Sequence, residues 1–245
     1  QGMRRTMQRV IGYLLVAITL SLAAVRPALA QSILRDSETE LLFRDMSAPI
    51  IRAAGLEPKN VKIVLINDDS INAFVAGGQI VYIHSGLITA ADNANQVQGV
   101  IAHEIGHITG GHIIRFDEGA KVATGITILS LLLGIAAAAA GAPDAGMGIL
   151  AAGQRAALGN FMAFTRAQES SADLAGASFL KGAGVSGKGS LEFFNKLRKQ
   201  EYRLAVYATD SYDRTHPLSQ ERVQALTEVY QKDAAWSRAT DPSLE

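Results

Sequence analysis

Residues 103–107 read His-Glu-Ile-Gly-His, within a stretch of helical periodicity. Residues four apart share one face of a helix, so His103 and His107 can direct two imidazole nitrogens at one metal ion. Glu104 follows directly, close enough for its carboxylate to reach a water on that ion. Two such ligands and a carboxylate base are most of what zinc-assisted peptide hydrolysis requires. The alternative, a chance match on a polar helix face, is weakened by the partner residues downstream.

A catalytic zinc normally takes three protein ligands and leaves the fourth position for water. The chain has only five histidines: His84, His103, His107, His112 and His216. One class of zinc peptidases carries its third histidine where this chain has Ile113. His112 is one residue short of that position, so we expect it to cap the end of the helix instead. His84 is expected to be an ordinary strand residue.

A better third ligand lies on a later helix, in the stretch TRAQESSAD at residues 165–173. Glu169 and Asp173 are four residues apart and therefore share a helical face. Glu169 can reach the metal, while Asp173 can accept the outer N–H of a ligand histidine and fix its orientation. Two solvated carboxylates are the alternative, since an isolated E-x-x-x-D pattern is common. Its place downstream of H-E-x-x-H, on a helix of its own, makes the pattern specific.

These motifs, together with a third near the C-terminus, resemble the zinc metallopeptidases of the HtpX, CAAX prenyl protease and BepA type. The family pattern is H-E-x-x-H, then E-x-x-x-D, then a late His-Pro followed by an arginine; His216-Pro217 and Arg222 supply the last part. The resemblance covers roughly residues 38–230 and is strongest to the periplasmic BepA-like branch. Many members of that branch continue into helical repeats, so we expect either a short member or a piece of a longer protein.

The resemblance implies a gluzincin fold that binds one Zn²⁺ per chain through His103, His107 and Glu169. Glu104 is then the general base that takes a proton from the activated water. His216 is implied either as a donor that steadies the oxyanion or as a resting-state ligand that blocks the open zinc position. A loop histidine bonded to backbone is the alternative. Arg222 is implied to hold the His216 loop through a carboxylate, unless it is a surface residue.

Residues 79–84 are expected to form the strand that meets the substrate. In peptidases of this type, an edge strand beside the active helix pairs with an extended substrate backbone. Such pairing recognises the backbone of the substrate and not its side chains, so it suits unfolded or unpaired β-segments. The residues assigned to it are Gln79, Ile80, Val81 and Tyr82.

Periodicity predicts the helices that position these residues. Apart from the hairpin described below, they are expected at 38–54, 92–111, 166–181, 191–206 and 219–236. Pro49 is expected to bend or split the first of them. Asp92 or Asn93 is the predicted N-cap of the H-E-x-x-H helix, and Gly110-Gly111 its end.

Residues 61–66 are rich in β-branched residues and predict a strand, and two further strands are predicted at 72–76 and 79–84, with Gly77-Gly78 as a tight turn. The predicted fold class is therefore α+β. It consists of a mostly helical gluzincin metallopeptidase domain with a small β-sheet beside the H-E-x-x-H helix.

Residues 120–165 predict a helical hairpin inserted in a single domain that spans residues 31–245. Residues 122–141 are almost entirely apolar and long enough to span a bilayer, but alanine, glycine, Thr124, Thr127 and Ser130 weaken that interpretation. Three roles are favoured over a span: a lid over the active site, a partner contact, and a peripheral membrane contact through residues 122–164.

The first 30 residues have the pattern of a secretory signal peptide. Arg4, Arg5 and Arg9 precede an apolar run at 10–25, and Ala28-Leu29-Ala30 forms a small-x-small cleavage pattern. A permanent membrane anchor is the alternative. The chain has no cysteine, so it should carry neither disulfides nor a lipid-modified cysteine. We therefore expect a periplasmic protein of a Gram-negative bacterium that is not a lipoprotein.

The charge balance is mild. The chain has 23 basic and 23 acidic residues, and removal of the first 30 residues would leave 19 basic against 23 acidic ones. No basic stripe is present, so we expect no nucleic-acid partner.

The leading hypothesis is a periplasmic zinc endopeptidase that cleaves misfolded or unassembled outer-membrane proteins, with the outer-membrane assembly machinery as a further partner. The substrate class follows from the resemblance and the compartment, and no single residue carries it. Two alternatives stay open. One is a chaperone or assembly factor with a self-inhibited peptidase site, and the other is an integral membrane peptidase that uses residues 122–141 as a span.

Overall fold

The computed structural model of the chain describes residues 37–204, 212 and 215–245. The signal peptide expected at residues 1–30 lies outside the described residues. In chain order, the described elements are α2 (Ser37–Ala53), the 3-10 helix η1 (Pro58–Asn60), β1 (Lys62–Ile66), β2 (Ala73–Val75), β3 (Ile80–His84), α3 (Ser85–Ala90), α4 (Ala94–Gly110), α5 (His112–Ala139), α6 (Pro143–Ala183), α7 (Lys188–Leu204), α9 (Gln220–Gln231) and the 3-10 helix η2 (Pro242–Leu244). The predicted fold class, mostly helical α+β with a small sheet, is confirmed.

The sheet has the strand order β1-β3-β2. β3 pairs in parallel with β1 and antiparallel with β2, and the turn between β2 and β3 uses Gly77 and Gly78 at φ 61° and 93°. The prediction that residues 79–84 form an edge strand is therefore wrong, because β3 has a neighbour on both sides. Gln79 itself precedes the strand. Strand β2 is an edge strand, because no described strand pairs with its side away from β3.

Helix α4 lies at the centre of the domain and contacts α2, α6, α7 and strands β2 and β3. Its first fourteen residues, Ala94–His107, are all buried. The predicted caps are confirmed: the Asn93 side chain accepts a hydrogen bond from the Gln96 backbone N–H, and Gly111 ends the helix at φ 63°. A helix enclosed in this way holds its polar side chains in fixed positions, which an active site requires.

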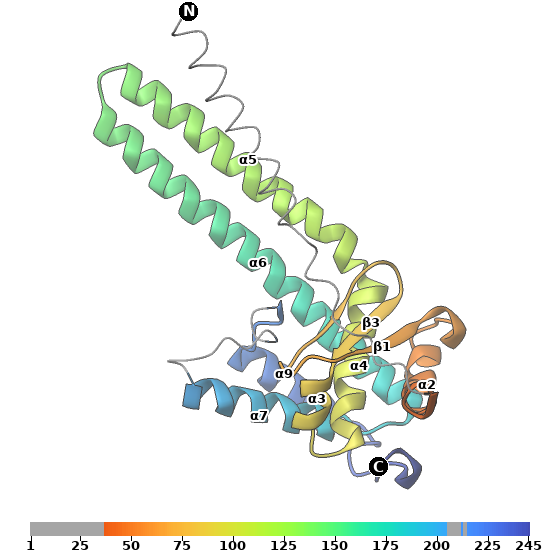
Figure 1. Cartoon of the computed structure of the whole chain (residues 1–245). Helices are drawn as coiled ribbons and strands as arrows, with labels where there is room; N and C mark the ends of the chain where they lie inside the picture. The colour runs from red at the N-terminus through yellow and green to blue at the C-terminus, as the bar shows by residue number, and fades with distance from the viewer. Residues whose placement is uncertain (1–36, 205–211, 213–214) are drawn as a thin grey trace, which may run out of the picture. The chain divides into compact units, whose positions relative to one another are not determined.

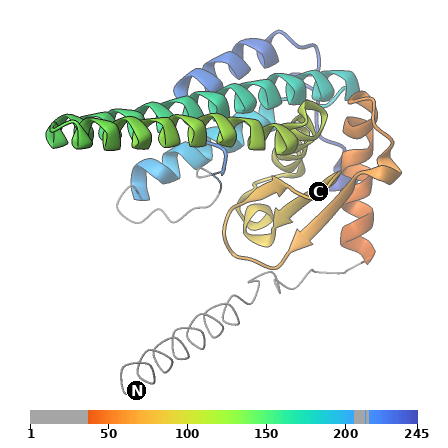
Figure 2. The ribbon, with the colours of Figure 1, turned by 90° about the horizontal axis from the view of Figure 1, so that it is seen from above.

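The predicted hairpin is formed by α5 and α6, which run side by side in both views (Figures 1 and 2). Small residues let the two helices approach closely: a Cβ on Gly146 would lie 2.5 Å from the Gly134 carbonyl oxygen. α6 is one continuous helix of 41 residues. The separate helix expected at 166–181 is thus the C-terminal part of α6, and one rigid element carries both the hairpin and Glu169.

The remaining helices complete the core. α2 continues through Pro49 as one helix, so of the two predicted outcomes, a bend or a split, the split does not occur. The helix buries Met46, Ile50 and Ile51. α7 buries Phe193, Phe194 and Leu197, as predicted. α9 is shorter than expected at its C-terminal end, and the short helix α3 was not predicted.

Candidate active site

The three residues of the H-E-x-x-H motif point from α4 into the interior. His103 and Glu104 are 4% and 0% exposed, and His107 is 9% exposed. The two imidazoles lie close together, with the Nε2 atoms of His103 and His107 3.0 Å apart. The i, i+4 spacing therefore does what the sequence predicted: it directs two nitrogen donors at one point.

A close crossing of α4 and α6 brings Glu169 to these histidines. A Cβ on Gly106 would lie 2.5 Å from the carbonyl oxygen of Ala172, and one on Gly176 would lie 3.0 Å from that of Ala102. The two backbones can approach this closely only because glycine stands at each contact. One turn before Ala172, the Glu169 carboxylate reaches both imidazoles.

Replacing Gly106 by alanine is expected to push α6 away from α4. Core overpacking of this kind costs about 1–3 kcal/mol of unfolding free energy, and the shift also separates Glu169 from the histidines. Gly159→Ala is the matched control, because Gly159 lies in α6, the helix that Gly106 contacts, with no atom within 4 Å of its Cβ position. It should be neutral or stabilise by up to about 1 kcal/mol. Chemical denaturation gives the unfolding free energy of both variants, and zinc titration gives their metal affinity. Equal stability and equal zinc affinity in the two variants would show that α4 and α6 do not depend on glycine at position 106 for their close approach.

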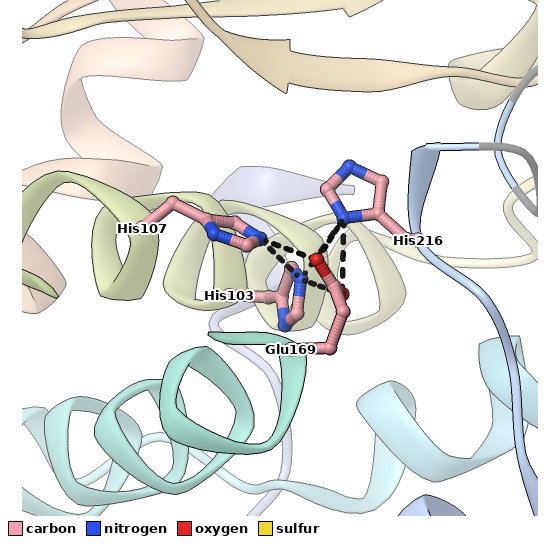
Figure 3. A group of neighbouring side chains, drawn as sticks. All are labelled: His103, His107, Glu169 and His216. Carbon is pink, nitrogen blue, oxygen red and sulfur yellow. Dashed lines mark hydrogen bonds and ion pairs between the residues drawn. The ribbon is translucent and has the colours of Figure 1, made fainter. Parts of the chain in front are cut away.

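Four side chains converge at the crossing (Figure 3). One possible ligand atom from each of His103, His107, Glu169 and His216 lies within 4.8 Å of the others. Glu169 bridges the group: its Oε2 is 3.2 Å from His103 Nε2, and its Oε1 is 3.2 Å from His107 Nε2. His216 Nδ1 lies 3.2 Å from Glu169 Oε2. These three imidazoles and one carboxylate form a donor set that can hold a metal ion, and the four residues are called the metal-ligand group below.

A second set of contacts orients His103. Its Nδ1 donates to Asp173 Oδ1 over 2.9 Å, which turns Nε2 toward Glu169. Arg222 in turn holds Asp173 by two bonds, from Nε to Oδ2 over 2.6 Å and from Nη2 to Oδ1 over 2.8 Å. Arg222 also donates to the Pro217 carbonyl over 2.7 Å, next to His216. Arg222 is 6% exposed, so the surface alternative for it is wrong.

The carboxylates of the cluster favour a positive charge on His103. Burial alone would lower the pKa of His103, but hydrogen bonds to Asp173 and Glu169 outweigh it and raise that pKa to about 10. Burial likewise opposes ionisation of Glu169, yet its contacts with the three histidines hold the pKa of its carboxyl below the usual range. Burial lowers the pKa of His107. A metal cation bound by His103 would therefore replace the proton on that imidazole, beside the ionised carboxylate of Glu169.

Glu104 is one of two described residues, with His84, that have buried side-chain polar atoms without a hydrogen-bond partner. Both carboxylate oxygens are buried without a hydrogen-bond partner among the described residues. His216 Nε2 lies 3.3 Å from Glu104 Oε1 and forms an ion pair with it when the imidazole is protonated. Burying a carboxylate this way is costly, which points to a function for it beside the metal-ligand group.

A cleft of about 510 Å³ opens onto these residues. Its lining comes from β2, α4, α5, α6 and the His216 loop: Phe74, Val75, Glu104, His107, His112, Asp117, Thr165, Gln168, Glu169, Thr215 and His216. The cleft thus exposes Glu104, edge strand β2 and the three members of the metal-ligand group other than His103 to the same space.

Residues 37–230 match peptidase family M48. The chain belongs to this family. The resemblance stated from the motifs is thereby confirmed, and the family agrees with the expected enzyme class, a metalloprotease.

Named relatives of this M48 chain include two assembly-enhancing proteases. It is 35% identical over 163 residues to the putative beta-barrel assembly-enhancing protease of Vibrio cholerae. It is 34% identical over 161 residues to the beta-barrel assembly-enhancing protease of Escherichia coli. Each match covers 65% of this chain but 32% of the relative, so the chain corresponds to about a third of their length. It is also 31% identical over 183 residues to the metalloprotease LoiP of Escherichia coli, which covers 72% of this chain and 65% of that protein.

The M48 chain contains two site residues that the sequence argument missed. His112 is the first residue of α5 and does not cap α4 as expected; it is buried, and its Nδ1 lies 2.8 Å from His107 Nδ1. The signal was Gly111, whose left-handed conformation turns the chain back toward His107. Tyr212 is 2% exposed, and its ring centroid lies 4.7 Å from that of His216.

Proposed function

We propose that the chain is a zinc-dependent endopeptidase of the periplasm that cleaves misfolded or unassembled envelope proteins, chiefly those of the outer membrane. The convergence of three imidazoles and one carboxylate within 4.8 Å, beside a buried Glu104, carries this proposal. A nitrogen-rich set with one carboxylate suits zinc, whereas calcium and magnesium prefer oxygen ligands. His103, His107 and Glu169 are the proposed ligands.

The chemistry divides between the metal and the chain. A zinc ion held there would act as a Lewis acid that polarises the scissile carbonyl and acidifies a water. Glu104 accepts the proton of that attacking water and later delivers it to the leaving amine. His216 is a candidate donor to the oxyanion, and Asp173 with Arg222 keeps His103 in position.

The substrate strand of this proposal is β2, which replaces the central strand β3 in that role. The Asn72 carbonyl accepts from His84 N–H, and Ala76 N–H donates to the Ile80 carbonyl, so these residues face β3. Successive residues of a strand alternate in direction, so the backbone groups of Ala73 and Val75 face the free edge and the cleft. An extended peptide that adds to this edge would be read through its main chain.

The same edge also supports a self-inhibited state. His216 Nε2 donates to the Ala73 carbonyl over 3.0 Å, while its Nδ1 faces Glu169. In this position His216 takes up one edge-strand acceptor and adds a fourth donor to the metal-ligand group. This observation favours the second candidate function, a chaperone or assembly factor whose peptidase opens only when a substrate displaces His216.

The compartment and the partners are part of the proposal. The signal-peptide pattern of residues 1–30 supports export to the periplasm, and the absence of cysteine argues against a lipoprotein. The names of the relatives support unfolded β-barrel proteins as substrates and the outer-membrane assembly machinery as a partner.

Metal removal tests the function directly. The purified protein should contain about one zinc per chain and cleave casein and a urea-unfolded outer-membrane β-barrel protein. Treatment with 1,10-phenanthroline should abolish cleavage, and added zinc should restore it, because the ion supplies the Lewis acid. Elemental analysis and gel-based cleavage assays are the measurements. Full activity in zinc-depleted protein would refute the mechanism.

A further inference from the structure

The outer side of the α5–α6 hairpin is apolar and exposed. Seven large aliphatic side chains of α5 are between 46% and 60% exposed: Val122, Ile128, Leu129, Leu131, Leu132, Leu133 and Ile135. α6 adds Met147, Leu158 and Met162. Monomeric soluble proteins seldom expose so many neighbouring apolar side chains, and such a surface marks an interaction site.

We propose that this hairpin docks on a lipid bilayer, with the outer side of α5 among the acyl chains. Asp117–Ala139 has a mean hydropathy of 2.2 in its most apolar stretch, only 11% of which is buried, and is long and apolar enough to cross a membrane. No Asp, Glu, Lys or Arg lies between Lys121 and Asp144. The surface thus has the composition of a membrane-contacting helix.

The distribution of the exposed side chains favours lipid over a protein partner. At 100° per residue, the seven α5 side chains point around more than half of the helix circumference, and only the side packed on α6 is covered. A protein partner would cover one side, whereas acyl chains surround a convex ridge. The exposed large hydrophobic residues of the hairpin are aliphatic or methionine, and the aromatic anchors typical of protein interfaces are absent from this set.

The charges of the hairpin fit the surface of a bilayer. Lys121 of α5 and Arg155 of α6 are both exposed, and their long side chains can reach lipid phosphates. Arg155 lies midway along the hairpin arm of α6, where a crossing helix would bury its charge in hydrocarbon. The hairpin therefore lies along the membrane surface, with α5 toward the acyl chains and α6 at the level of the headgroups.

Docking would also fix the orientation of the active site. α6 runs without a break from Pro143 to Ala183 and carries Glu169 in its C-terminal half. A hairpin held on the bilayer therefore holds the metal-ligand helix at a set angle to the membrane. The inference does not depend on peptidase activity.

Site-specific labelling tests the proposal in the full chain. The chain has no cysteine, so Leu132→Cys and the control Leu174→Cys each give a single site for an environment-sensitive nitrobenzoxadiazole label. Leu174 is 53% exposed on α6, outside the hairpin. With vesicles of phosphatidylcholine and phosphatidylglycerol, the label at 132 should shift to the blue and brighten, and that at 174 should not. Vesicles of phosphatidylcholine alone should give a smaller effect, because Lys121 and Arg155 lose their anionic partners.

A triple variant measures the contribution of α5. Leu129→Asn, Leu132→Asn and Leu133→Asn together should lower vesicle partitioning in flotation assays at least about tenfold, whereas Val229→Asn on α9 should leave it unchanged. The N-terminal apolar run is common to every variant and cancels in this comparison. If the triple variant misfolds, the single labels still decide the question.

Two results would overturn the proposal. One is a label at 132 that does not respond to saturating vesicles. The other is a label at 132 that shifts without vesicles, in step with protein concentration and a rise in molecular mass by light scattering. That result would mean that a second copy of the chain covers this surface.

Discussion

Glu104→Gln is expected to lower the rate of peptide hydrolysis at least about a hundredfold, at the low end of what a positioned general base contributes. The amide keeps the size of the side chain but cannot accept the proton of the attacking water. Metal binding should persist, because Glu104 is not among the four ligand candidates. Stability should hold or rise, since the variant removes a buried carboxylate that has no hydrogen-bond partner among the described residues.

The measurements are casein cleavage, zinc content and the urea midpoint of the same preparation. Asp117→Asn is the matched control, because it neutralises an exposed carboxylate of the same cleft without touching the ligand group. Activity near that of the wild type in Glu104→Gln would remove Glu104 from the mechanism. If Glu104→Gln is inactive yet still rescues outer-membrane assembly in cells, the chaperone function is favoured over proteolysis.

Glu169→Gln is expected to weaken zinc binding more strongly than the roughly 10- to 100-fold loss typical of an outer hydrogen-bond partner. The substitution removes the only carboxylate among the four ligand candidates, which, together with Asp173, raises the pKa of His103. Cleavage should disappear at zinc concentrations that saturate the wild type.

Competition with a fluorescent zinc chelator gives the affinity. Asp144→Asn, which changes an exposed acidic residue of the same helix, should bind zinc like the wild type. Asp173→Asn should fall between the two, because Asp173 acts through His103. Wild-type affinity in Glu169→Gln would show that the metal, if bound, does not use α6.

Local patterns predicted much of the fold. The α4 caps, Asn93 and Gly111, and the buried face of α7 followed from residue types whose conformational preferences act over a few neighbours. The order of the strands did not, because β-branched composition is the same for an edge strand and a central one. The continuity of α6 was also missed, since Thr165 and the nearby polar residues interrupt hydrophobic periodicity without breaking backbone hydrogen bonds.

The sequence by itself determined which side chains could hold a metal: His103 and His107 one helical turn apart, and Glu169 with Asp173 on a second helix. Only the tertiary structure decided their convergence, because the approach of α4 and α6 depends on backbone contacts at Gly106 and Gly176. It likewise brought His216 to Glu169, 47 residues apart in sequence, and gave the cleft edge to β2. Spacing along a helix is fixed by local geometry, whereas distances between helices depend on packing that no short segment encodes.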